Sequence, residues 1–418
     1  MNLFMIKLGK AWNTVKREGL FRGGKRVLIF FGEYLQSIIN VTPGDILFIT
    51  AGVGDSALYR AHNQAEELRH HGFRVSVTMQ DNPFLSGLAD KFQIFIFHRT
   101  LQTAAVARLV AKIKAQHKEI IFDADDLVFD TKYVQQTDHY RNMTALEKKQ
   151  YAKGVGEEIL KDPYVKVCTT STQFIAAILK SYGKKVFVTT NKLSEGWLAI
   201  ADKLLANYKP PASTHEDSST RGGQTTNLPA GRHGRKQIRI GYFSGTVGHN
   251  KDFATVSDAL VAILEKYPQT ELFLAGPLEL EDKFVKYSGR IIRSIYVPRK
   301  IHFANIAACD IILAPLEKDP FSEGKSELKF SEAGLLEVPV VAVKNQTFSG
   351  AIIDGLNGFL ADGTLEWTAK LERLVTDANL RRLMGERARE KALKDYTTKN
   401  SHSEEYYAYL RSRLQPVK

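Results

Sequence analysis

Short apolar runs alternate with amphipathic stretches through most of the chain, and this alternation restricts the fold more than any other feature of the sequence. Between residues 46 and 190 the apolar runs are ILFIT, FRVSVTM, FQIFIFH, EIIF, VKVCTT and KVFVTT, and helix-like stretches begin near Ser56, Leu101, Met143 and Ser171. Strands that are almost continuously apolar and separated by helices form a parallel sheet with both faces covered. The sequence therefore predicts a doubly wound α/β domain over residues 41–208.

The alternation stops at residues 209–236 and then begins again. This segment is rich in Gly, Pro, Ser and Thr, and its apolar side chains are too few to offset the entropy cost of ordering it, so we expect a flexible linker or insertion. After it come the apolar runs QIRIGYF, ELFLAG, IRSIYV, CDIILAP, VPVVAV and GFLA. We predict a second doubly wound domain over residues 237–395, followed by a helix at 396–418 that can cross back to the first domain.

Two domains also agree with the length of the chain, because 418 residues exceed what one hydrophobic core usually supports. Open α/β sheets bind their ligands outside the carboxyl ends of the strands. The predicted fold class is therefore α/β, with two Rossmann-like doubly wound parallel-sheet domains facing a cleft. We expect the ligand-binding residues in the loops that follow the strands.

Residues 1–40 differ from the rest of the chain. Phe4, Leu8, Trp12 and Val15 recur at helical spacing, and residues 1–26 contain seven basic residues and one acidic residue, a net charge of +6 out of +12 for the chain. A basic amphipathic helix that carries an indole binds anionic membrane surfaces, although such a helix can equally dock on its own domain. Nucleic acid is not expected as a partner, because no nucleic-acid-binding module is recognisable.

The sequence predicts a cytoplasmic protein, peripheral at the inner face of the cell membrane. The N-terminus lacks the small-residue cleavage site of a secretion signal, and the early apolar segment from Val27 contains Glu33 and is too short to span a bilayer. Cys168 and Cys309 stand in apolar, strand-like settings without metal-ligand spacing. We therefore expect both to be buried, inert thiols.

Two glycine loops leave strands and enter helices. ITAGVGDSALYRA places Gly52 and Gly54 before a helix, where glycine lets the backbone approach a ligand and the helix N-terminus favours an anion. A plain tight turn is the alternative interpretation. In GYFSGTVGHNKDF, Gly245 and Lys251 precede the next such helix. Backbone amides, a helix N-terminus and a lysine together suit a diphosphate.

FIFHRT and IIFDADDLVFD put polar side chains at the ends of the third and fourth strands. His98 falls where ligand-facing residues of such sheets lie, although a lone histidine is more often structural. For Asp123, Asp125 and Asp126 three interpretations remain open: divalent metal ligands, a catalytic base or hydrogen-bonding group, and a solvated loop with a helix cap. We take His98, Asp125 and Asp126 as the catalytic candidates and expect no bound metal.

The stretch GKSELKFSEAGLLEVPVV carries four charged side chains directly ahead of a buried strand, namely Lys325, Glu327, Lys329 and Glu332. If Ser326 caps a helix, Lys329 lies in its first turn and Glu332 lies one turn later on the same face. The lysine and the free amides would then hold phosphates, and the glutamate would accept hydrogen bonds from vicinal ribose hydroxyls. The alternative, a surface ion pair, contributes little and leaves the other two charges unexplained.

The segment SELKFSEAGLLEVPVVA resembles the nucleotide-sugar-binding segment of retaining glycosyltransferases of family four, which have the GT-B fold. CDIILAPLE, GYFSGTVGHNKDF, the later DGLNGFLA and the early G-x-G loop fall in that family's order over residues 45–400. FDADDLVFD resembles a bacterial subgroup associated with O-antigen, capsule and exopolysaccharide assembly. The resemblance implies transfer of a sugar from a nucleotide diphosphate sugar to a glycan or lipid-linked acceptor, with retention of anomeric configuration and without a metal or other cofactor.

The resemblance also assigns roles by position. Glu332 matches the glutamate that contacts the donor ribose, and Lys251 matches the lysine that binds the donor phosphate. The glycine loop after the first strand matches the loop that faces the diphosphate. His98 matches a histidine near the transferred sugar, and Asn191 in VTTNKL aligns with an asparagine at the domain junction. The donor-binding candidates are Gly52, Gly54, Asn191, Gly245, Lys251, Lys325, Lys329 and Glu332.

The sequence departs from the family pattern at two places. The family's first glutamate, eight positions before Glu332, is Gly324 here, with Glu323 one residue away, and the usual arginine ahead of the phosphate-binding lysine is replaced near Thr246. Lys329 can supply the missing positive charge. Two alternative functions remain: a degenerate nucleotide-sugar-binding subunit that partners an active transferase, and a nucleotide-sugar epimerase of the same fold.

Overall fold

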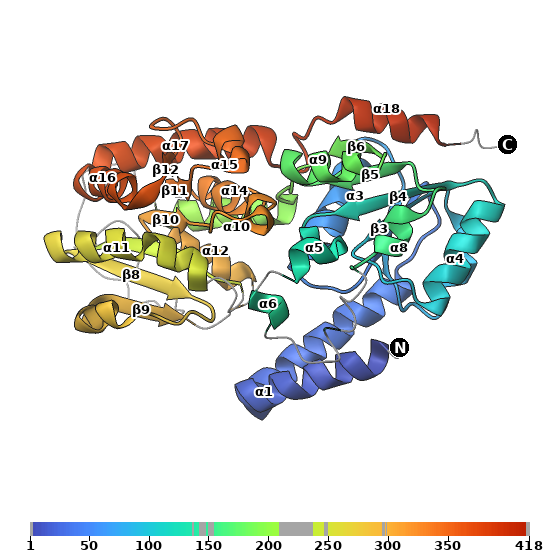
Figure 1. Ribbon diagram of the computed structural model, residues 1–418, viewed down its shortest axis with the longest axis horizontal. Helices are drawn as coiled ribbons and strands as arrows, with labels where there is room; N and C mark the ends of the chain where they lie inside the picture. The colour runs from blue at the N-terminus through green and yellow to red at the C-terminus, as the bar shows by residue number, and fades with distance from the viewer. Residues whose placement is uncertain are drawn as a thin grey trace, which may run out of the picture. The chain divides into compact units, whose positions relative to one another are not determined.

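The computed structural model describes residues 3–135, 138–141, 148, 154–208, 237–245, 250–294, 297 and 299–414. The chain divides into two compact units: Met1–Lys192 with Ser401–Lys418 form the first, and Leu193–Asn400 form the second. Each unit is built around one six-stranded sheet (Figure 1). The linker expected at residues 209–236 and the helix expected near Met143 lie outside the described residues.

The sheet of the first unit contains all six strands expected there. Its strands are β1 (Ile46–Thr50), β2 (Val75–Met79), β3 (Ile94–His98), β4 (Glu119–Ala124), β5 (Val167–Thr170) and β6 (Lys185–Val188). They are parallel and pair in the order β2-β1-β3-β4-β5-β6. The order reverses between β1 and β3, so ligands of this sheet are expected outside the carboxyl ends of these two strands.

Helices connect the strands of this sheet. Their bounds are α2 (Asp55–Ala57), the π-helix η1 (Leu58–His62), α3 (Asn63–His70), the 3-10 helix η2 (Leu85–Lys91), α4 (Ala104–Ala115), the 3-10 helix η3 (Leu127–Phe129), α5 (Thr131–Val134), α6 (Asp138–Arg141), α8 (Glu157–Lys161) and α9 (Gln173–Ser181). The local sequence accounts for α4, because Thr103 caps its first turn and Val106, Leu109, Val110 and Ile113 form one buried face.

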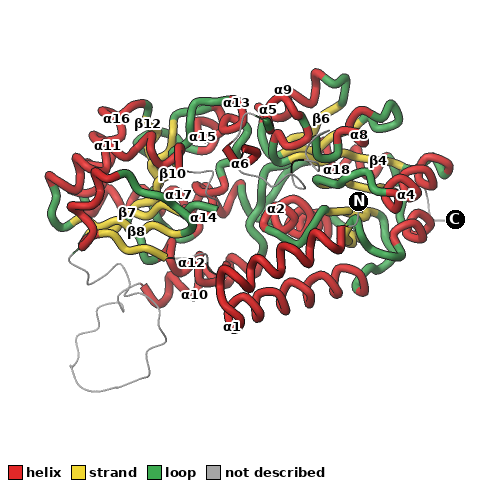
Figure 2. The backbone as a smooth tube through the Cα atoms, turned by 60° about the horizontal axis from the view of Figure 1, so that its bottom comes forward, coloured by secondary structure: helices red, strands yellow, loops and turns green. Residues whose placement is uncertain are grey.

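The N-terminal helix α1 (Leu3–Ile39) bends sharply at Gly19, so that its two arms lie side by side (Figure 2). Gly19 has φ 80° and ψ 165°, a conformation that glycine adopts readily and other residues avoid. Thr78 Oγ1 of β2 donates a hydrogen bond to the Ser37 carbonyl (2.9 Å), which ties the second arm to the sheet. Large apolar side chains of α1 are exposed: Trp12, Leu20, Phe21, Leu28, Ile29, Leu35 and Ile39.

The second unit repeats the parallel architecture, again with all six expected strands. They are β7 (Ile238–Phe243), β8 (Thr270–Ala275), β9 (Ile291–Ser294), β10 (Ile311–Ala314), β11 (Val340–Val343) and β12 (Phe359–Ala361). Their order is β12-β11-β10-β7-β8-β9, so the reversal lies between β7 and β10. The carboxyl ends of these two strands are the expected ligand edge of this unit.

The helices of the second unit are α10 (Glu195–Tyr208), α11 (Asn250–Lys266), the 3-10 helix η5 (Asp282–Arg290), α12 (Arg299–Ala307), α13 (Pro320–Glu323), α14 (Leu328–Leu335), α15 (Gln346–Ala351), α16 (Gly363–Thr376) and α17 (Ala378–Asp395). The sequence pattern assigned residues 193–208 to the first domain, whereas the structure places them in this unit. The reason is a set of long-range contacts: Trp197 stacks on Phe303 of α12 with centroids 5.2 Å apart, and Asp202 pairs with Arg389 of α17 at 2.6 Å.

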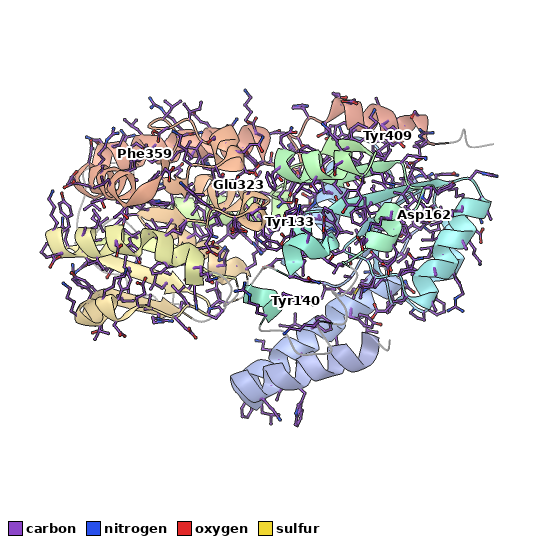
Figure 3. The ribbon with its side chains drawn as sticks, viewed as in Figure 1. Tyr133, Tyr140, Asp162, Glu323, Phe359 and Tyr409 are labelled. Carbon is purple, nitrogen blue, oxygen red and sulfur yellow. The ribbon has the colours of Figure 1, made fainter. Side chains whose placement is uncertain are left out.

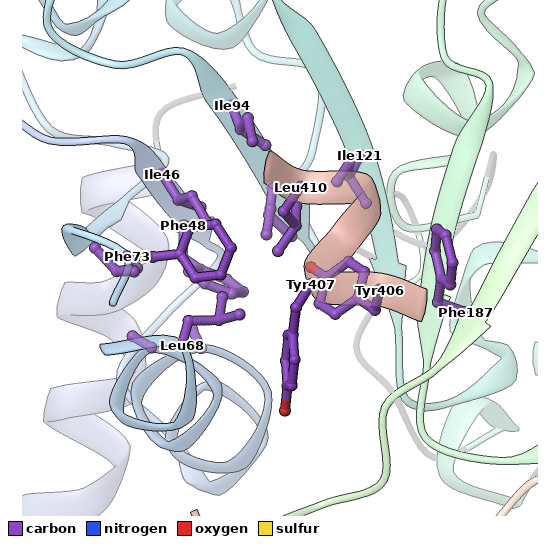
Figure 4. Packing of buried hydrophobic residues seen from close by; sticks show 14 of the residues in the cluster. Ile46, Phe48, Leu68, Phe73, Ile94, Ile121, Phe187, Tyr406, Tyr407 and Leu410 are labelled. Atoms are coloured by element: carbon purple, nitrogen blue, oxygen red, sulfur yellow. The ribbon is translucent and has the colours of Figure 1, made fainter. Parts of the chain in front are cut away.

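The last helix, α18 (Glu404–Ser412), belongs to the first unit although the residues before Ser401 belong to the second. Tyr406, Tyr407 and Leu410 are buried among apolar side chains of β1, β3 and β4, as Figure 4 shows. Tyr409, labelled in Figure 3, donates a hydrogen bond to Glu119 Oε1 (2.8 Å). The chain thus passes twice between the units, once after Lys192 and once after Asn400.

Candidate functional site

The loop of residues 51–54 leaves β1 at the reversal point of the first sheet. Thr50 Oγ1 donates a hydrogen bond to the Gly52 carbonyl (2.9 Å), and Gly54 is the N-cap residue of α2. A Cβ atom at either glycine would meet no atom within 4 Å, and neither glycine has a positive φ. The fold therefore does not itself require glycine at these positions, whereas the close approach of a ligand would.

His98 ends β3 and engages both of its ring nitrogens in hydrogen bonds. The residue is only 1% exposed; Nδ1 lies 2.7 Å from Asp123 Oδ1 and Nε2 lies 2.7 Å from Ser56 Oγ. The contact with Asp123 follows from the strand register, which pairs His98 directly with Asp123 of β4. Ser56, in the first turn of α2, also donates a hydrogen bond to Asp125 Oδ2 (2.8 Å).

Arg60 lies in the π-helix η1, and its side chain is buried in the core beside this network. The guanidinium is completely buried and pairs with both oxygens of Asp123, with Nη2–Oδ2 at 2.6 Å and Nε–Oδ1 at 3.2 Å. It also donates hydrogen bonds to Thr189 and to Asn191 Oδ1 (3.4 Å). Burial alone would raise the pKa of Asp123, but Arg60 and His98 outweigh it and hold this pKa below its usual value.

Arg99 joins Asp125 and Asp126 at the outer side of the network. Its Nε lies 2.6 Å from Asp125 Oδ1 and its Nη2 lies 3.4 Å from Asp126 Oδ2. Arg99 has φ 50°, a conformation that is uncommon outside glycine and recurs at functional sites. Burial alone would raise the pKa of Asp125, yet Arg99, His98 and Ser56 together place it well below the ordinary range. Asp125 is therefore a stable carboxylate and a weak base.

The structure thus brings the three catalytic candidates together, each held by protein partners. Asp126 also accepts a hydrogen bond from Leu127 N (3.0 Å), so the helix-cap interpretation describes one of its contacts. Among the described residues, no group of His, Cys, Asp or Glu side chains has the arrangement of a metal site. Sequence reasoning missed Ser56 and Arg60, although their spacing of four residues at a helix start places them on one face.

Asn191, a donor-binding candidate, is 8% exposed and lies beside Arg60 in the first unit. Asn63 Nδ2 and Gln64 Nε2 donate hydrogen bonds to the neighbouring carbonyls of Lys192 (2.6 Å) and Thr190 (3.1 Å). These bonds fix the chain immediately before it leaves the first unit. The contacts of Asn191 therefore include the arginine that holds Asp123.

In the second unit, the loop after β7 and the start of α11 lie at the reversal point. Gly245 is exposed, and a Cβ there would meet no atom within 4 Å; at Gly276, by contrast, a Cβ would lie 1.9 Å from the Ser244 carbonyl oxygen. Lys251 is exposed in the first turn of α11. Asp252 Oδ1 accepts a hydrogen bond from Glu317 N (2.9 Å), which ties α11 to the segment after β10. Residues 246–249 lie outside the described residues, and with them the replaced family arginine near Thr246.

The helix expected in the charged stretch is α14, but its cap differs from the prediction. The N-cap residue is Glu327 rather than Ser326, because the helix begins one residue later than the sequence pattern suggested. Lys329 lies in the first turn, half-buried, with its ammonium 5.6 Å from the centroid of the Tyr242 ring. Burial and the nearby Lys325 lower the pKa of Lys329, against the opposing effect of Asp252. Lys325 lies over the Phe321 ring, 4.4 Å from its centroid.

Glu332 of α14 is buried and each of its oxygens has a cationic or histidine partner. Arg299 Nη1 lies 2.5 Å from Oε1, and His302 Nε2 lies 3.1 Å from Oε2. Both partners come from α12, at its first turn, and sequence reasoning missed them. The one local feature that could have indicated these partners is their spacing of three residues, which places both on one face of a helix that follows a strand of the same sheet. Glu323 ends α13 (Figure 3), and Gly324 is the residue that caps this helix at its C-terminus.

Comparisons with known proteins agree with this architecture. Residues 232–391 match the family described as glycosyl transferases group 1. Alr3699/HepE of Anabaena, solved in complex with UDP, is 15% identical, with a TM-score of 0.54 and coverage of 88% of this chain and 100% of that chain. Sucrose-phosphate synthase of Thermosynechococcus elongatus is 13% identical, with a TM-score of 0.55 and coverage of 88% and 97%. A glycosyltransferase of Rickettsia africae is 12% identical, with a TM-score of 0.57 and coverage of 90% and 100%. No curated protein sequence matched the chain.

Proposed function

We propose that this chain, which has the GT-B fold and matches the glycosyl transferases of group 1 over residues 232–391, transfers a sugar from a nucleotide diphosphate sugar to a glycan or lipid-linked acceptor. The observation that carries the proposal is the arrangement of α14, with Lys329 in its first turn and Glu332 further along the helix. The proposal includes retention of anomeric configuration, as the family resemblance implies, and a role in the synthesis of cell-surface polysaccharide.

The nucleotide half of the donor has chemically suitable partners in the second unit. Lys329 and Lys251 each stand in the first turn of a helix, where the helix dipole adds to the positive charge. A diphosphate is the ligand that such helix starts favour. The UDP complex of Alr3699/HepE, a protein of the same fold, supports a nucleoside diphosphate as the ligand class.

Glu332 suits the ribose of that nucleotide. A carboxylate has about four lone-pair positions and can accept hydrogen bonds from several donors at once, as Glu332 already does from Arg299 and His302. The same two partners fix the orientation of the carboxylate. Ribose is therefore bound at a group that is already held in place before the donor arrives.

We also propose that the transfer proceeds without a metal ion. The negative charge that develops on the leaving diphosphate would be stabilised by the two lysines and by the helix N-termini, which carry out the electrostatic role that a metal has in other enzymes. The expected outcome is that a chelator such as EDTA leaves the rate of transfer unchanged. Loss of activity with a chelator, and its recovery with a divalent cation, would contradict this part of the proposal.

The N-terminal helix supports a further part of the proposal, binding to an anionic membrane surface. Phe21 is 92% exposed and Leu20 is 75% exposed, and both stand directly after the sharp bend at Gly19. Residues 1–26 carry a net charge of +6. Exposed apolar side chains combined with basic residues favour insertion into the interface of an anionic bilayer. Among the described residues, no helix is both long and apolar enough to cross a membrane.

A vesicle flotation assay tests this part. Phe21→Ser is expected to reduce the fraction of protein that floats with vesicles containing phosphatidylglycerol. Leu365→Ser is the matched control, because Leu365 is 85% exposed in the second unit and should leave flotation unchanged. Equal flotation of all three proteins, or flotation that does not depend on anionic lipid, would contradict membrane binding through α1.

A panel of nucleotide sugars tests the transferase itself. A ligand that binds only the native state raises the melting temperature, so a thermal-shift screen identifies the donor, and labelled donor then reports transfer to an acceptor. Donor binding without turnover across an acceptor panel would favour the binding-subunit alternative, which Gly324 in place of the family glutamate motivates. Release of free epimerised sugar without an acceptor would favour the epimerase.

A further inference from the structure

The hydrogen bonds around His98 contain a serine, a histidine and an aspartate in a row. Ser56 Oγ lies 2.7 Å from Nε2, and Asp123 Oδ1 lies 2.7 Å from Nδ1. These distances match a catalytic triad, in which a neutral histidine takes the proton of a serine nucleophile. A fourth group decides against that interpretation, because Ser56 Oγ also lies 2.8 Å from Asp125 Oδ2.

The number of protons in this row follows from what each group can donate. Asp123 and Asp125 are carboxylates and can only accept, since arginines hold the pKa of each below its usual range. The single proton of the Ser56 hydroxyl must therefore point to Asp125. The hydroxyl oxygen then has only lone pairs to offer His98, so Nε2 must carry a proton. Asp123 likewise requires a proton on Nδ1.

We propose that His98 carries protons on both ring nitrogens, and that this imidazolium, acting through Ser56, positions the 51–54 loop, which contains the donor-binding candidates Gly52 and Gly54. A neutral His98 would leave one contact without a proton, either between Ser56 Oγ and Asp125 Oδ2 (2.8 Å) or, in the other tautomer, between Nδ1 and Asp123 Oδ1 (2.7 Å). Two acceptor atoms that face each other in this way at a buried or half-buried site are strongly unfavourable. The role in transfer rests on the function proposed above, whereas the protonation state does not.

Among the described residues that form this network, the charges balance when His98 is cationic. The network then contains three cations, Arg60, Arg99 and His98. It also contains three anions, Asp123, Asp125 and Asp126. Two further titratable groups face the network and are neutral. Burial raises the pKa of Tyr406, on α18, well above its usual value, and burial raises the pKa of the Cys168 thiol, on β5, to about 12. With a neutral His98 the buried network would carry an uncompensated negative charge, which is costly.

Ser56 connects this charge to the loop that is expected to meet the donor. It stands two residues after Gly54, in the first turn of α2, and its hydroxyl is fixed on one side by His98 and on the other by Asp125. Because His98 is 1% exposed and both its N–H groups are already used, it acts as a positioning residue rather than a catalytic one. The same proton count excludes Ser56 as a nucleophile activated by His98.

Nitrogen-15 NMR of the full chain with labelled histidine tests the proposal directly. The chain contains 11 histidines, and the resonance pair lost in His98→Gln identifies His98. At neutral pH both of its nitrogens are expected at shifts typical of imidazolium, each coupled to a bonded proton. One protonated nitrogen and one at the shift of an unprotonated acceptor would overturn the proposal. The remaining histidines report whether each variant is folded.

Asp125→Asn is the variant that tests the cause. An asparagine amide can donate to Ser56 Oγ, which frees the hydroxyl proton for Nε2, so the Nε2 resonance is expected to move to the unprotonated range. Asp130→Asn is the matched control: Asp130 caps α5 through Lys132 N (2.9 Å) and is not part of the charged network, asparagine also caps helices, and His98 should remain doubly protonated. An unchanged His98 signal in Asp125→Asn would overturn the argument.

Two further measurements separate the role of Ser56 from the transferase proposal. A serine-reactive fluorophosphonate is expected to leave Ser56 unlabelled, and labelling that His98→Gln abolishes would establish the triad instead. In a donor titration, His98→Gln is expected to weaken binding, whereas a merely structural histidine would lower the melting temperature without changing the affinity. If no nucleotide sugar binds the wild-type chain, the proposed function fails while the NMR result stands independently.

Discussion

Replacement of Glu332 by glutamine should weaken donor binding without disrupting the fold. The substitution keeps the size of the side chain but removes its charge and one acceptor oxygen. Two ribose hydroxyls that donate to a carboxylate each contribute about 1.5–3 kcal/mol, against about 0.5–1.5 kcal/mol for a neutral acceptor. The expected loss of about 2 kcal/mol corresponds to a dissociation constant roughly 30-fold higher.

The same substitution also affects Arg299 and His302, which lose their ionised partner. Their side chains are 15% and 23% exposed, so water can replace part of the lost interaction, and the cost in stability is expected to be about 1–2 kcal/mol rather than the larger values of fully buried pairs. This cost appears in the melting temperature of the ligand-free chain, and the affinity loss appears separately in the titration.

Isothermal titration calorimetry with the nucleoside diphosphate of the identified donor measures the affinity. Glu265→Gln is the matched control, because Glu265 is an exposed glutamate of the same unit that pairs with Lys286 at 3.3 Å. It should bind as the wild-type chain does. If Glu332→Gln also binds with unchanged affinity, Glu332 does not contact the ribose and the assignment of the donor site is wrong.

Three further outcomes are expected. Donor affinity should fall with rising pH earlier than for an ordinary lysine, because burial lowers the pKa of Lys329 and its charge is lost sooner; Lys329→Arg should remove this dependence in pH-resolved titrations, and an unchanged profile would contradict the role of Lys329. Arg60→Met leaves Asp123 buried without its main cation and should reduce the free energy of unfolding by about 3–5 kcal/mol in urea denaturation, whereas a change below about 1 kcal/mol would refute the buried-pair argument. Leu410→Ala should reduce the free energy of unfolding by about 2–5 kcal/mol, measured in the same way, because Leu410 is completely buried where α18 docks; full stability of the variant would show that the helix does not contribute to the core.

The strands were predictable from the sequence because burial on both faces of a parallel sheet leaves a continuous apolar signature. Ile46–Thr50 and Ile94–His98, for example, are buried at every position. Parallel order then places the ends of these strands at one edge, which is why His98 and the glycine loop could be assigned to a common site without any contact being known.

The partners of these residues could not be predicted, because they come from distant positions in the chain. Ser56 is 42 residues from His98 and 69 from Asp125, and Arg299 is 33 residues from Glu332. No periodicity links such pairs, and a single serine or arginine in a helix is ordinary. The cap of α14 was missed for a different reason: serine is a common cap residue, yet the helix begins at Leu328 with Glu327 before it.

Release of nucleoside diphosphate from the donor, measured with and without acceptor, tests the central claim most directly. The account predicts that the full chain releases the diphosphate from one nucleotide sugar, that an added glycan or lipid-linked acceptor accelerates the release, and that labelled sugar appears on the acceptor in equal amount. Absence of any acceptor-dependent release across the panel of nucleotide sugars and acceptors would contradict it.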